Sequence, residues 1–164
     1  MEVKRSQQFR KHWKYWLSAG LLTLVGLVLW VRMKNDPAAV IKREFRRAGL
    51  TDQLIAWWTA IAKHETANFT SRVFRDSNNL FSMKLAGKNT TAIGALPYGE
   101  RQAIFRSVTD SAKDQILFMT RRWNYPKDFA SLEQLISYMK ARNYFEQNEA
   151  DYLAAVKQWM KQTG

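Results

Sequence analysis

The chain has 164 residues, 46% of them hydrophobic and 13% aromatic, which is enough apolar material for one folded domain and an additional segment. The absence of cysteine excludes disulfide frameworks, thiol nucleophiles and cysteine-based metal sites. The formal net charge of +12 favours an anionic partner, such as lipid headgroups, cell-wall polymer or nucleic acid. No RNA-binding or zinc-finger signature accompanies the charge, so we do not expect nucleic-acid binding.

The first segment with a clear signature is an uncharged run of 17 residues from Tyr15 to Val31. At about 1.5 Å per residue, a helix of this length just crosses the hydrocarbon core of a bilayer. Tryptophans lie near both ends of the run, as interfacial aromatic side chains do: Trp13, Trp16 and Trp30. We therefore predict a basic cytoplasmic tail at 1–14 and a transmembrane anchor at 15–33.

A cleaved signal peptide and a buried core helix are the alternatives to an anchor. We favour a retained anchor, because the run is apolar on all sides and no small-x-small cleavage site follows Val31. Four basic residues precede the run within ten positions and two follow it, which favours a cytoplasmic N-terminus. Counting the basic residues between 42 and 47 erases that bias. The prediction is a single-pass membrane protein whose remaining domain is periplasmic or extracellular.

The region 34–50 predicts a helix that connects the anchor to the domain. Asp36 and Pro37 are typical of an N-cap and a first helical position, and Gly49 is a plausible stop. Val40, Ile41 and Phe45 alternate with four basic residues. We expect a connecting helix with a solvated basic face, and contact with lipid headgroups is a second use for that face.

The remainder, 51–164, is predicted to be mostly helical, and its first helix ends near Glu65. Leu54, Trp58, Ile61 and Glu65 are spaced 4, 3 and 4 apart, which lines one helical face. A carboxylate thus ends an apolar stripe at the negative end of a helix dipole. Both surroundings disfavour the charged form and raise the pKa, as a general acid working near neutral pH requires. A surface Glu paired with a neighbouring cation is the alternative.

Residues 66–105 predict loop, with a short hairpin across Ala92–Ala95. Three helices follow, with starts marked by capping residues: Ser111-x-x-Asp114, Ser131-x-x-Gln134 and Asn148. Pro126 is expected to end the first of them. The apolar stripes of these helices, including Tyr152, Val156 and Trp159, predict core packing.

The order of segments in 51–162 resembles the glucosaminidase family of peptidoglycan hydrolases, which belongs to the lysozyme-like superfamily. The pieces that carry the resemblance are Ala62-Lys63-His64-Glu65-Thr66-Ala67-Asn68-Phe69-Thr70-Ser71, Asn79-Leu80-Phe81-Ser82-Met83-Lys84, Phe105-Arg106-Ser107-Val108-Thr109-Asp110-Ser111, and Asn143-Tyr144-Phe145 through Asp151-Tyr152-Leu153. The resemblance implies a lysozyme-like helical domain in which Glu65 is the catalytic acid. His64 is a candidate for tuning the pKa of Glu65.

Three positions depart from the family pattern. Ser82 replaces the usual Gly, which predicts that the backbone there does not need a positive φ. Val108 replaces an aromatic residue. The family's second carboxylate, which acts as base or nucleophile, has Glu100 as its match, although the surrounding sequence is not a close copy. Asp76 and Asp110 are the fallbacks, and they are more typical of a turn former and a helix cap.

Sugar rings are bound by flat apolar faces and a few amide or hydroxyl partners. The candidates by residue type and placement are Asn79, Phe81, Tyr98 and Tyr125. No metal or cofactor is expected, because His12 and His64 are the only histidines and no metal-ligand spacing is present.

The preferred prediction is a membrane-anchored peptidoglycan hydrolase of the endo-β-N-acetylglucosaminidase type, whose partner is the glycan strand. Three alternatives remain open. The first is lytic-transglycosylase-like cleavage by a single Glu. The second is a non-catalytic wall-binding or scaffold module with the same fold. The third is an anchored interaction protein with an unrelated helical fold. Oligomeric state is left open by the sequence.

Overall fold

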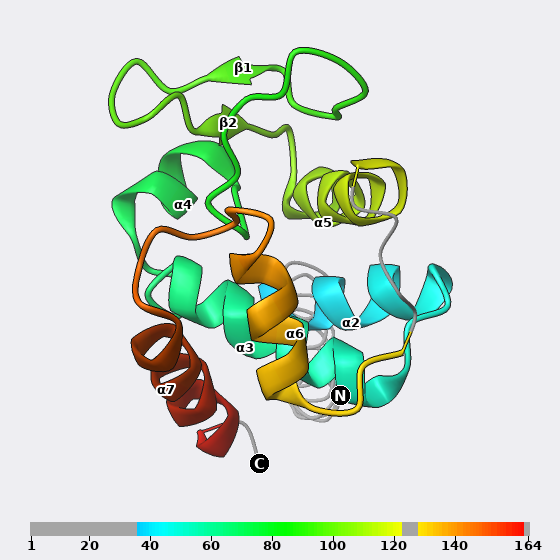
Figure 1. Cartoon of the computed structure of the whole chain (residues 1–164). Coiled ribbons are helices and arrows are strands. Elements are labelled where there is room, and N and C mark those ends of the chain that lie inside the picture. The colour runs from blue at the N-terminus through cyan, green and yellow to red at the C-terminus, as the bar shows by residue number, and fades with distance from the viewer. Residues whose placement is uncertain (1–35, 123–127, 163–164) are drawn as a thin grey trace, which may run out of the picture. The chain divides into compact units, whose positions relative to one another are not determined.

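The computed structural model describes residues 36–122 and 128–162, which form a mostly helical domain with one small antiparallel hairpin (Figure 1). The mostly helical fold class is therefore confirmed. The predicted tail and anchor at 1–33 and the candidate Tyr125 lie outside the described residues. Within the described ranges, no helix combines the length and apolarity needed to span a membrane.

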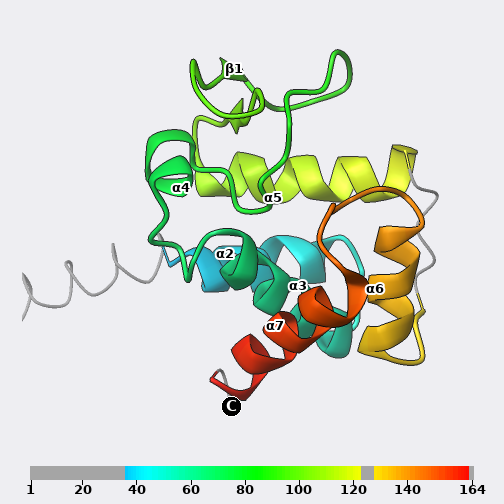
Figure 2. The same ribbon diagram turned by 60° about the vertical axis from the view of Figure 1, so that its left-hand side comes forward.

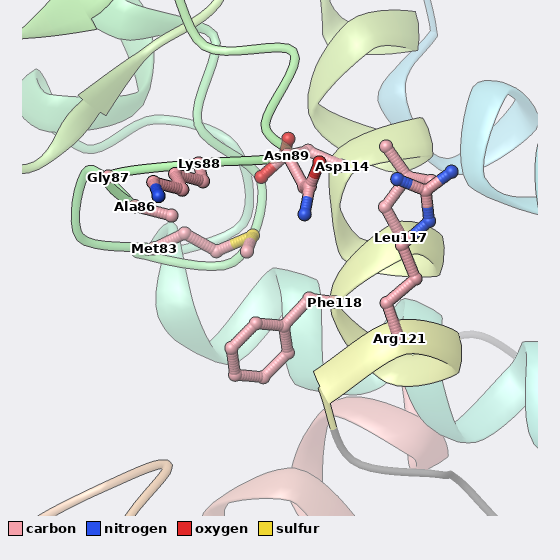
Figure 3. A pocket seen from close by; sticks show the side chains of 9 residues that line it. All are labelled: Met83, Ala86, Gly87, Lys88, Asn89, Asp114, Leu117, Phe118 and Arg121. Atoms are coloured by element: carbon pink, nitrogen blue, oxygen red, sulfur yellow. The ribbon is translucent and has the colours of Figure 1, made fainter.

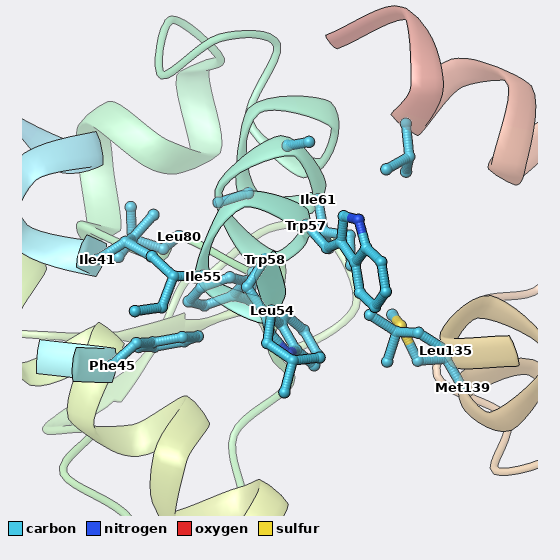
Figure 4. Close-up of a cluster of buried hydrophobic side chains, with 14 of the residues drawn as sticks. Ile41, Phe45, Leu54, Ile55, Trp57, Trp58, Ile61, Leu80, Leu135 and Met139 are labelled. Atoms are coloured by element: carbon cyan, nitrogen blue, oxygen red, sulfur yellow. The ribbon is translucent and has the colours of Figure 1, made fainter. Parts of the chain in front are cut away.

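Helix α3 (Asp52–Glu65) runs through the middle of the domain. Thr51 caps its start by accepting a hydrogen bond from the Leu54 amide, as the sequence predicts. Eight of its residues are buried, and they cover most of the helix circumference (Figure 4). The stripe residues Leu54, Trp58 and Ile61 are each at most 2% exposed. A helix that is buried on nearly all sides needs covering elements all round, and α2 and α7 supply two of them.

Helix α2 (Pro37–Arg47) lies within the predicted connector and ends where Gly49 adopts a φ of +84°. It packs on α3 and on α5, and it buries Val40, Ile41 and Phe45 in the main core (Figure 4). Its exposed side carries Lys42, Arg46 and Arg47, which is the basic face that we expected. The helix therefore contributes to the domain core, a role that was not predicted for it.

A short helix, α4 (Arg72–Ser77), leads to strands β1 (Gly94–Ala95) and β2 (Ala103–Ile104). The strands pair antiparallel, with Gly94 opposite Ile104 and Ala95 opposite Ala103. A hairpin is thus confirmed, but its predicted position across Ala92–Ala95 is wrong, because only Gly94–Ala95 of those residues form a strand and their partners are Ala103–Ile104. The turn occupies 96–102 instead. Figure 2 shows α5 between this hairpin and α2.

Helix α5 (Val108–Leu117) continues as a π-helical turn, η1 (Phe118–Arg122). Its predicted start is wrong by one turn. Ser107 caps it, accepting from the Asp110 amide and donating to the Asp110 carboxylate, whereas Ser111 and Asp114 are buried inside the helix.

Two helices complete the domain: α6 (Leu132–Lys140), capped by Ser131, and α7 (Glu149–Lys161), capped by Asn148. Both caps are as predicted. The helices pack against each other, and α7 also packs along α3, which brings Tyr152 of α7 to the end of α3.

Candidate active site

The carboxylate of Glu65 is held at the C-terminal end of α3 by a residue from α7. The hydroxyl of Tyr152 donates a hydrogen bond to Glu65 Oε1 at 2.6 Å. Tyr152 itself is 2% exposed, so its position is set by packing. Because this donor occupies Oε1, the second carboxyl oxygen is the one that carries a proton when Glu65 is neutral.

The backbone around Glu65 is unusual. Directly after the helix, Ala67, Asn68 and Phe69 all adopt positive φ angles of 48°, 57° and 63°. Such conformations are costly for residues with a Cβ, and three in succession need support from their surroundings. Thr66 provides part of it, because its hydroxyl donates to the Ala62 carbonyl at 2.6 Å and accepts from the Phe69 amide at 2.9 Å.

Ser82 ties the next segment to the same helix end. Its hydroxyl donates to the Glu65 carbonyl oxygen at 3.1 Å. Its φ is +49°, so the prediction that this position does not need a positive φ is wrong. The chain turns sharply at Ser82, in a conformation that the glycine of the family pattern adopts easily. The serine hydroxyl also donates to a carbonyl at the end of α3 that has no partner within the helix.

Burial dominates the protonation of Glu65. Removal of its carboxyl group from water raises its pKa, because the charged form loses its hydration. The Tyr152 hydrogen bond and the nearby His64 lower the pKa by less. The group therefore holds its proton to a higher pH than an exposed glutamate does.

Aromatic rings support this arrangement. Tyr152 stacks on Phe145 with ring centroids 3.9 Å apart, and His64 meets the Tyr152 ring edge-on at 4.8 Å. Tyr144 donates from its hydroxyl to the Phe81 carbonyl at 3.2 Å. Burial raises the pKa of both Tyr144 and Tyr152 well above the ordinary value, so both hydroxyls stay protonated and act as donors.

Glu65 opens into a cleft of about 760 Å³, a volume suited to a ligand of several rings. One wall is built from the segment 81–86 and the hairpin turn that carries Glu100. The other wall is the loop 142–147, between α6 and α7. Exposed amide side chains reach the cleft from that loop, from Asn143 and Gln147.

Glu100 lines the same cleft but in a different environment. It is exposed and forms an ion pair with Lys84. That hydrogen-bonded pairing lowers the pKa of Glu100 and raises the pKa of Lys84. The hairpin turn is held to Lys84 and its neighbour by backbone contacts, including a hydrogen bond from the Leu85 amide to the Arg101 carbonyl at 2.8 Å. The pKa of Glu65 is therefore raised and that of Glu100 lowered within the same cleft.

A family model confirms the resemblance seen in the sequence. The model named Glucosaminidase, described as mannosyl-glycoprotein endo-beta-N-acetylglucosaminidase, matches residues 42–164, which is more than half of the chain. The chain belongs to this family. The family is one of lysozyme-like peptidoglycan hydrolase domains. No curated protein and no solved structure matches the chain.

The match begins inside α2, so the glucosaminidase domain includes part of the helix predicted as a connector. Glu65 and Glu100 come from distant parts of this domain and line one cleft. Phe81 also lines the cleft, but it is only 2% exposed and its ring packs between Phe45 and Trp58. The Phe81 ring thus supports the floor of the cleft and does not present a face to a sugar.

Asn79 is 1% exposed, and its amide is fully used by the backbone. Its nitrogen donates to the carbonyls of Met83 and Ala103, and its oxygen accepts from the amides of Phe81 and Met83. No group of Asn79 is left for a glycan. The expectation that Asn79 binds substrate is therefore replaced by a role in joining the 79–84 segment to β2.

Tyr98 does not line the cleft. It bonds to Asp76 and lies against the guanidinium of Arg72, at 4.7 Å from its ring centroid, so it fastens the hairpin to α4. Asp76 and Asp110 are thereby accounted for as a clamp and a cap, and neither lines the cleft. Among the residues that the structure describes, no group of three or more His, Asp or Glu side chains could hold a metal ion.

Sequence reasoning missed the supporting residues Tyr152, Ser82 and Lys84. All three stand inside the motifs that carry the family resemblance, which was the available signal. Tyr152 was assigned to the core because its helical spacing matches a core stripe, and both roles turn out to hold for the same side chain.

Proposed function

We propose that the protein is a peptidoglycan hydrolase of the endo-β-N-acetylglucosaminidase type, with Glu65 as its general acid. The observation that supports this most is the half-buried Glu65, whose carboxyl pKa is raised by burial at the edge of a cleft that also contains Glu100. Two carboxyl groups whose pKa values are shifted in opposite directions suit the acid and base roles of glycoside hydrolysis.

In the proposed reaction, Glu65 donates its proton to the glycosidic oxygen as the bond from that oxygen to the anomeric carbon breaks. The leaving sugar departs as an alcohol, and positive charge develops on the remaining ring. Glu100, kept ionised by Lys84, takes a proton from a water molecule whose oxygen bonds to the anomeric carbon. Proton exchange with solvent then restores both groups. Tyr152 holds the Glu65 carboxyl group in place throughout.

The cleft offers polar partners for the acetamido and hydroxyl groups of an amino sugar. Asn143 and Gln147 are exposed there, and Phe145 presents part of its surface beside them. We propose these three as the substrate-binding residues of the 142–147 wall. They replace Asn79 and Tyr98 as candidates, because the side chains of those two residues bond to other parts of the protein.

We further propose that the segment 15–33 tethers the enzyme to the membrane with residues 1–14 in the cytoplasm. The support is the 17-residue uncharged run and its flanking tryptophans. A tethered enzyme would act on glycan close to the membrane. Alkaline extraction of membranes, followed by protease protection of the C-terminal domain, tests both the tether and its orientation.

The decisive test is Glu65→Gln, assayed by mass spectrometry of the fragments released from purified sacculi. Glutamine keeps the shape and can accept the Tyr152 hydrogen bond, but it has no acidic proton. We expect a loss of activity of about 10²- to 10⁴-fold with folding intact. Glu146→Gln is the matched control, because it also lines the cleft, and it should remain active. Full activity of Glu65→Gln would refute the proposal.

A single-carboxyl mechanism is the second candidate, because Glu100 is exposed and already paired with Lys84. In that case a sugar hydroxyl attacks the anomeric carbon, and the product is an anhydro sugar. The same mass spectra distinguish the two reactions, because the anhydro product is lighter than the hydrolysis product by one water. Glu100→Gln would then retain most of the activity.

A further inference from the structure

A second cavity, of about 370 Å³, adjoins the cleft (Figure 3). It is formed between the loop that follows Lys84 and the last turns of α5 and η1. The lining residues that set its charge and apolarity are Met83, Ala86, Lys88, Asp114, Phe118 and Arg121. Its volume is within the range of small-ligand sites, so it can accept more than a single ion.

The cavity adjoins the cleft, because the two spaces share lining residues. Met83, Ala86 and Phe118 line both spaces. A chain lying in the Glu65 cleft would therefore have a branch point next to the second cavity. A linear sugar chain that carries side branches fits this layout, with its backbone in the cleft and a branch in the cavity.

The charges of the cavity indicate what kind of branch it takes. Lys88 and Arg121 are exposed, and neither forms an ion pair with another residue in the described ranges 36–122 and 128–162. Figure 3 shows Lys88 on the loop side and Arg121 on the helix side, with Asn89 and Asp114 between them and with Met83 and Phe118 lower in the view. The cavity is thus lined by two cations on opposite sides, and Met83 and Phe118 form its apolar floor.

Asp114 contributes one negative charge, and its position is fixed. It is 4% exposed, and its Oδ1 accepts from the Thr91 amide at 2.5 Å and from the hydroxyls of Thr90 and Thr91 at 2.7 and 3.2 Å. These bonds fasten the loop to α5 and so shape the cavity. Two cations, one carboxylate and an apolar floor complement a short peptide with several carboxylates, one free amine and small apolar side chains.

We propose that this cavity binds the peptide stem of peptidoglycan, with Lys88 and Arg121 paired to the stem carboxylates. The inference rests on the proposed function, because it places the glycan of the same substrate in the Glu65 cleft. Met83 and Phe118 contact the methyl groups of the stem alanines. A phosphate polymer would leave the apolar floor unused and would be repelled by Asp114, which favours the peptide.

The test is equilibrium binding to the full-length chain in detergent, in the Glu65→Gln background so that the probe is not cut. Three probes are compared: a purified glycan fragment with peptide stems, the same fragment with its stems removed, and the same fragment with its stem carboxylates converted to amides. We expect the stem-bearing fragment to bind about tenfold more tightly than either of the others.

Lys88→Met with Arg121→Met should abolish that preference while leaving the affinity for stem-free glycan unchanged. Methionine keeps the length and helix propensity of both side chains but removes their charge. The matched control is Lys113→Met with Lys161→Met, two exposed cations outside both cavities whose loss changes the net charge equally. The control should keep the preference.

Equal affinity of the unmutated cavity for stem-bearing and amidated fragments overturns the inference without reference to any variant. Equal weakening by the test pair and the control pair also overturns it, because the effect would then be one of bulk charge. A failure of the proposed function is distinguishable: wild type would cut none of the fragments, yet the difference in binding between them would still be measured.

Discussion

The carboxyl groups of Glu65 and Glu100, which line the same cleft, belong to regions with opposite character. Glu65 ends a helix that is buried on nearly all sides, whereas Glu100 sits on the exposed turn of a two-stranded hairpin. Burial raises the pKa of the first, and the Lys84 partner lowers the pKa of the second. The pKa of the same residue type is thus shifted upward in one region and downward in the other, as the proposed acid and base roles require.

The comparison teaches that the two carboxyl groups are positioned in different ways, one by core packing and the other by a few polar contacts. The Glu65 region is rigid because it is packed, and its hydrogen bonds come from residues held by the core. The Glu100 region is positioned by a few backbone hydrogen bonds and one ion pair. Substitutions that shorten, uncouple or neutralise each group should therefore have unequal effects.

The largest contrast is expected from shortening each carboxylate by one methylene. Glu65→Asp should lower kcat by about 100-fold, because a displacement of about 1 Å breaks the alignment of a positioned group. Glu100→Asp should cost only a few-fold, because an exposed turn can readjust. Steady-state rates on a soluble glycan substrate measure both. Equal losses in the two variants would show that the regions do not differ in rigidity.

The next effect concerns Asn79, which joins the 79–84 segment to β2. Asn79→Ala removes four hydrogen bonds to buried backbone groups and should lower the free energy of unfolding by at least about 2 kcal/mol. Chemical denaturation measures the loss. Asn143→Ala is the control, because it is exposed and should leave stability nearly unchanged while weakening substrate binding. The reverse pattern would restore Asn79 as a sugar ligand.

Smaller effects should appear in the pH dependence of kcat/KM. The proposed reaction requires protonated Glu65, so activity should fall as pH rises through the Glu65 pKa. It also requires ionised Glu100, so activity should fall as pH drops through the Glu100 pKa.

Tyr152→Phe removes a hydrogen bond that lowers the Glu65 pKa, so the alkaline limb should move to higher pH. Lys84→Met removes the partner that lowers the Glu100 pKa, so the acidic limb should move to higher pH. A pH profile that is unchanged in both variants would contradict the assignment of the limbs.

The smallest effect is on stability. Between its ordinary value of 4.5 and its raised folded value, Glu65 binds more protons in the folded state than in the unfolded state, so unfolding free energy falls as pH rises through this window. Glu65→Gln removes that loss. The variant should have a higher Tm than wild type above the folded pKa, and the gap should close below pH 4.5. Calorimetry at several pH values tests this. A variant less stable than wild type at high pH would argue against desolvation as the cause of the raised pKa.

Local sequence signals predicted those elements whose physics is local. Thr51, Ser131 and Asn148 cap their helices as expected, because a capping side chain needs only the amides two or three residues ahead. The α5 start was misplaced because Ser107 and Ser111 both offer a cap three residues before an acid, and only packing selects Ser107. The prediction that Leu54, Trp58, Ile61 and Glu65 share one helical face is confirmed, because helical spacing alone places them on one side of α3.

Ser82 shows that replacing a glycine by another residue does not reveal the backbone conformation at that position unless the tertiary structure is known. Its φ of +49° is imposed by the path of the chain around the end of α3, and its hydroxyl has a partner that is 17 residues away in sequence. Asn79 was similarly misread, because an amide that binds sugars and one that binds backbone look the same in sequence. The partners that distinguish them come from distant segments.

Sequence alone determined the helical class, the position of Glu65 at the end of α3 and the order of motifs that places the chain in its family. These properties follow from side-chain spacing and residue type, which are local. Only the tertiary structure decided that Tyr152 holds Glu65, that Lys84 keeps Glu100 ionised and that a second cavity opens beside the cleft. Those contacts join residues that are distant in the chain, and the pKa of each group depends on the burial and charges that folding brings to it.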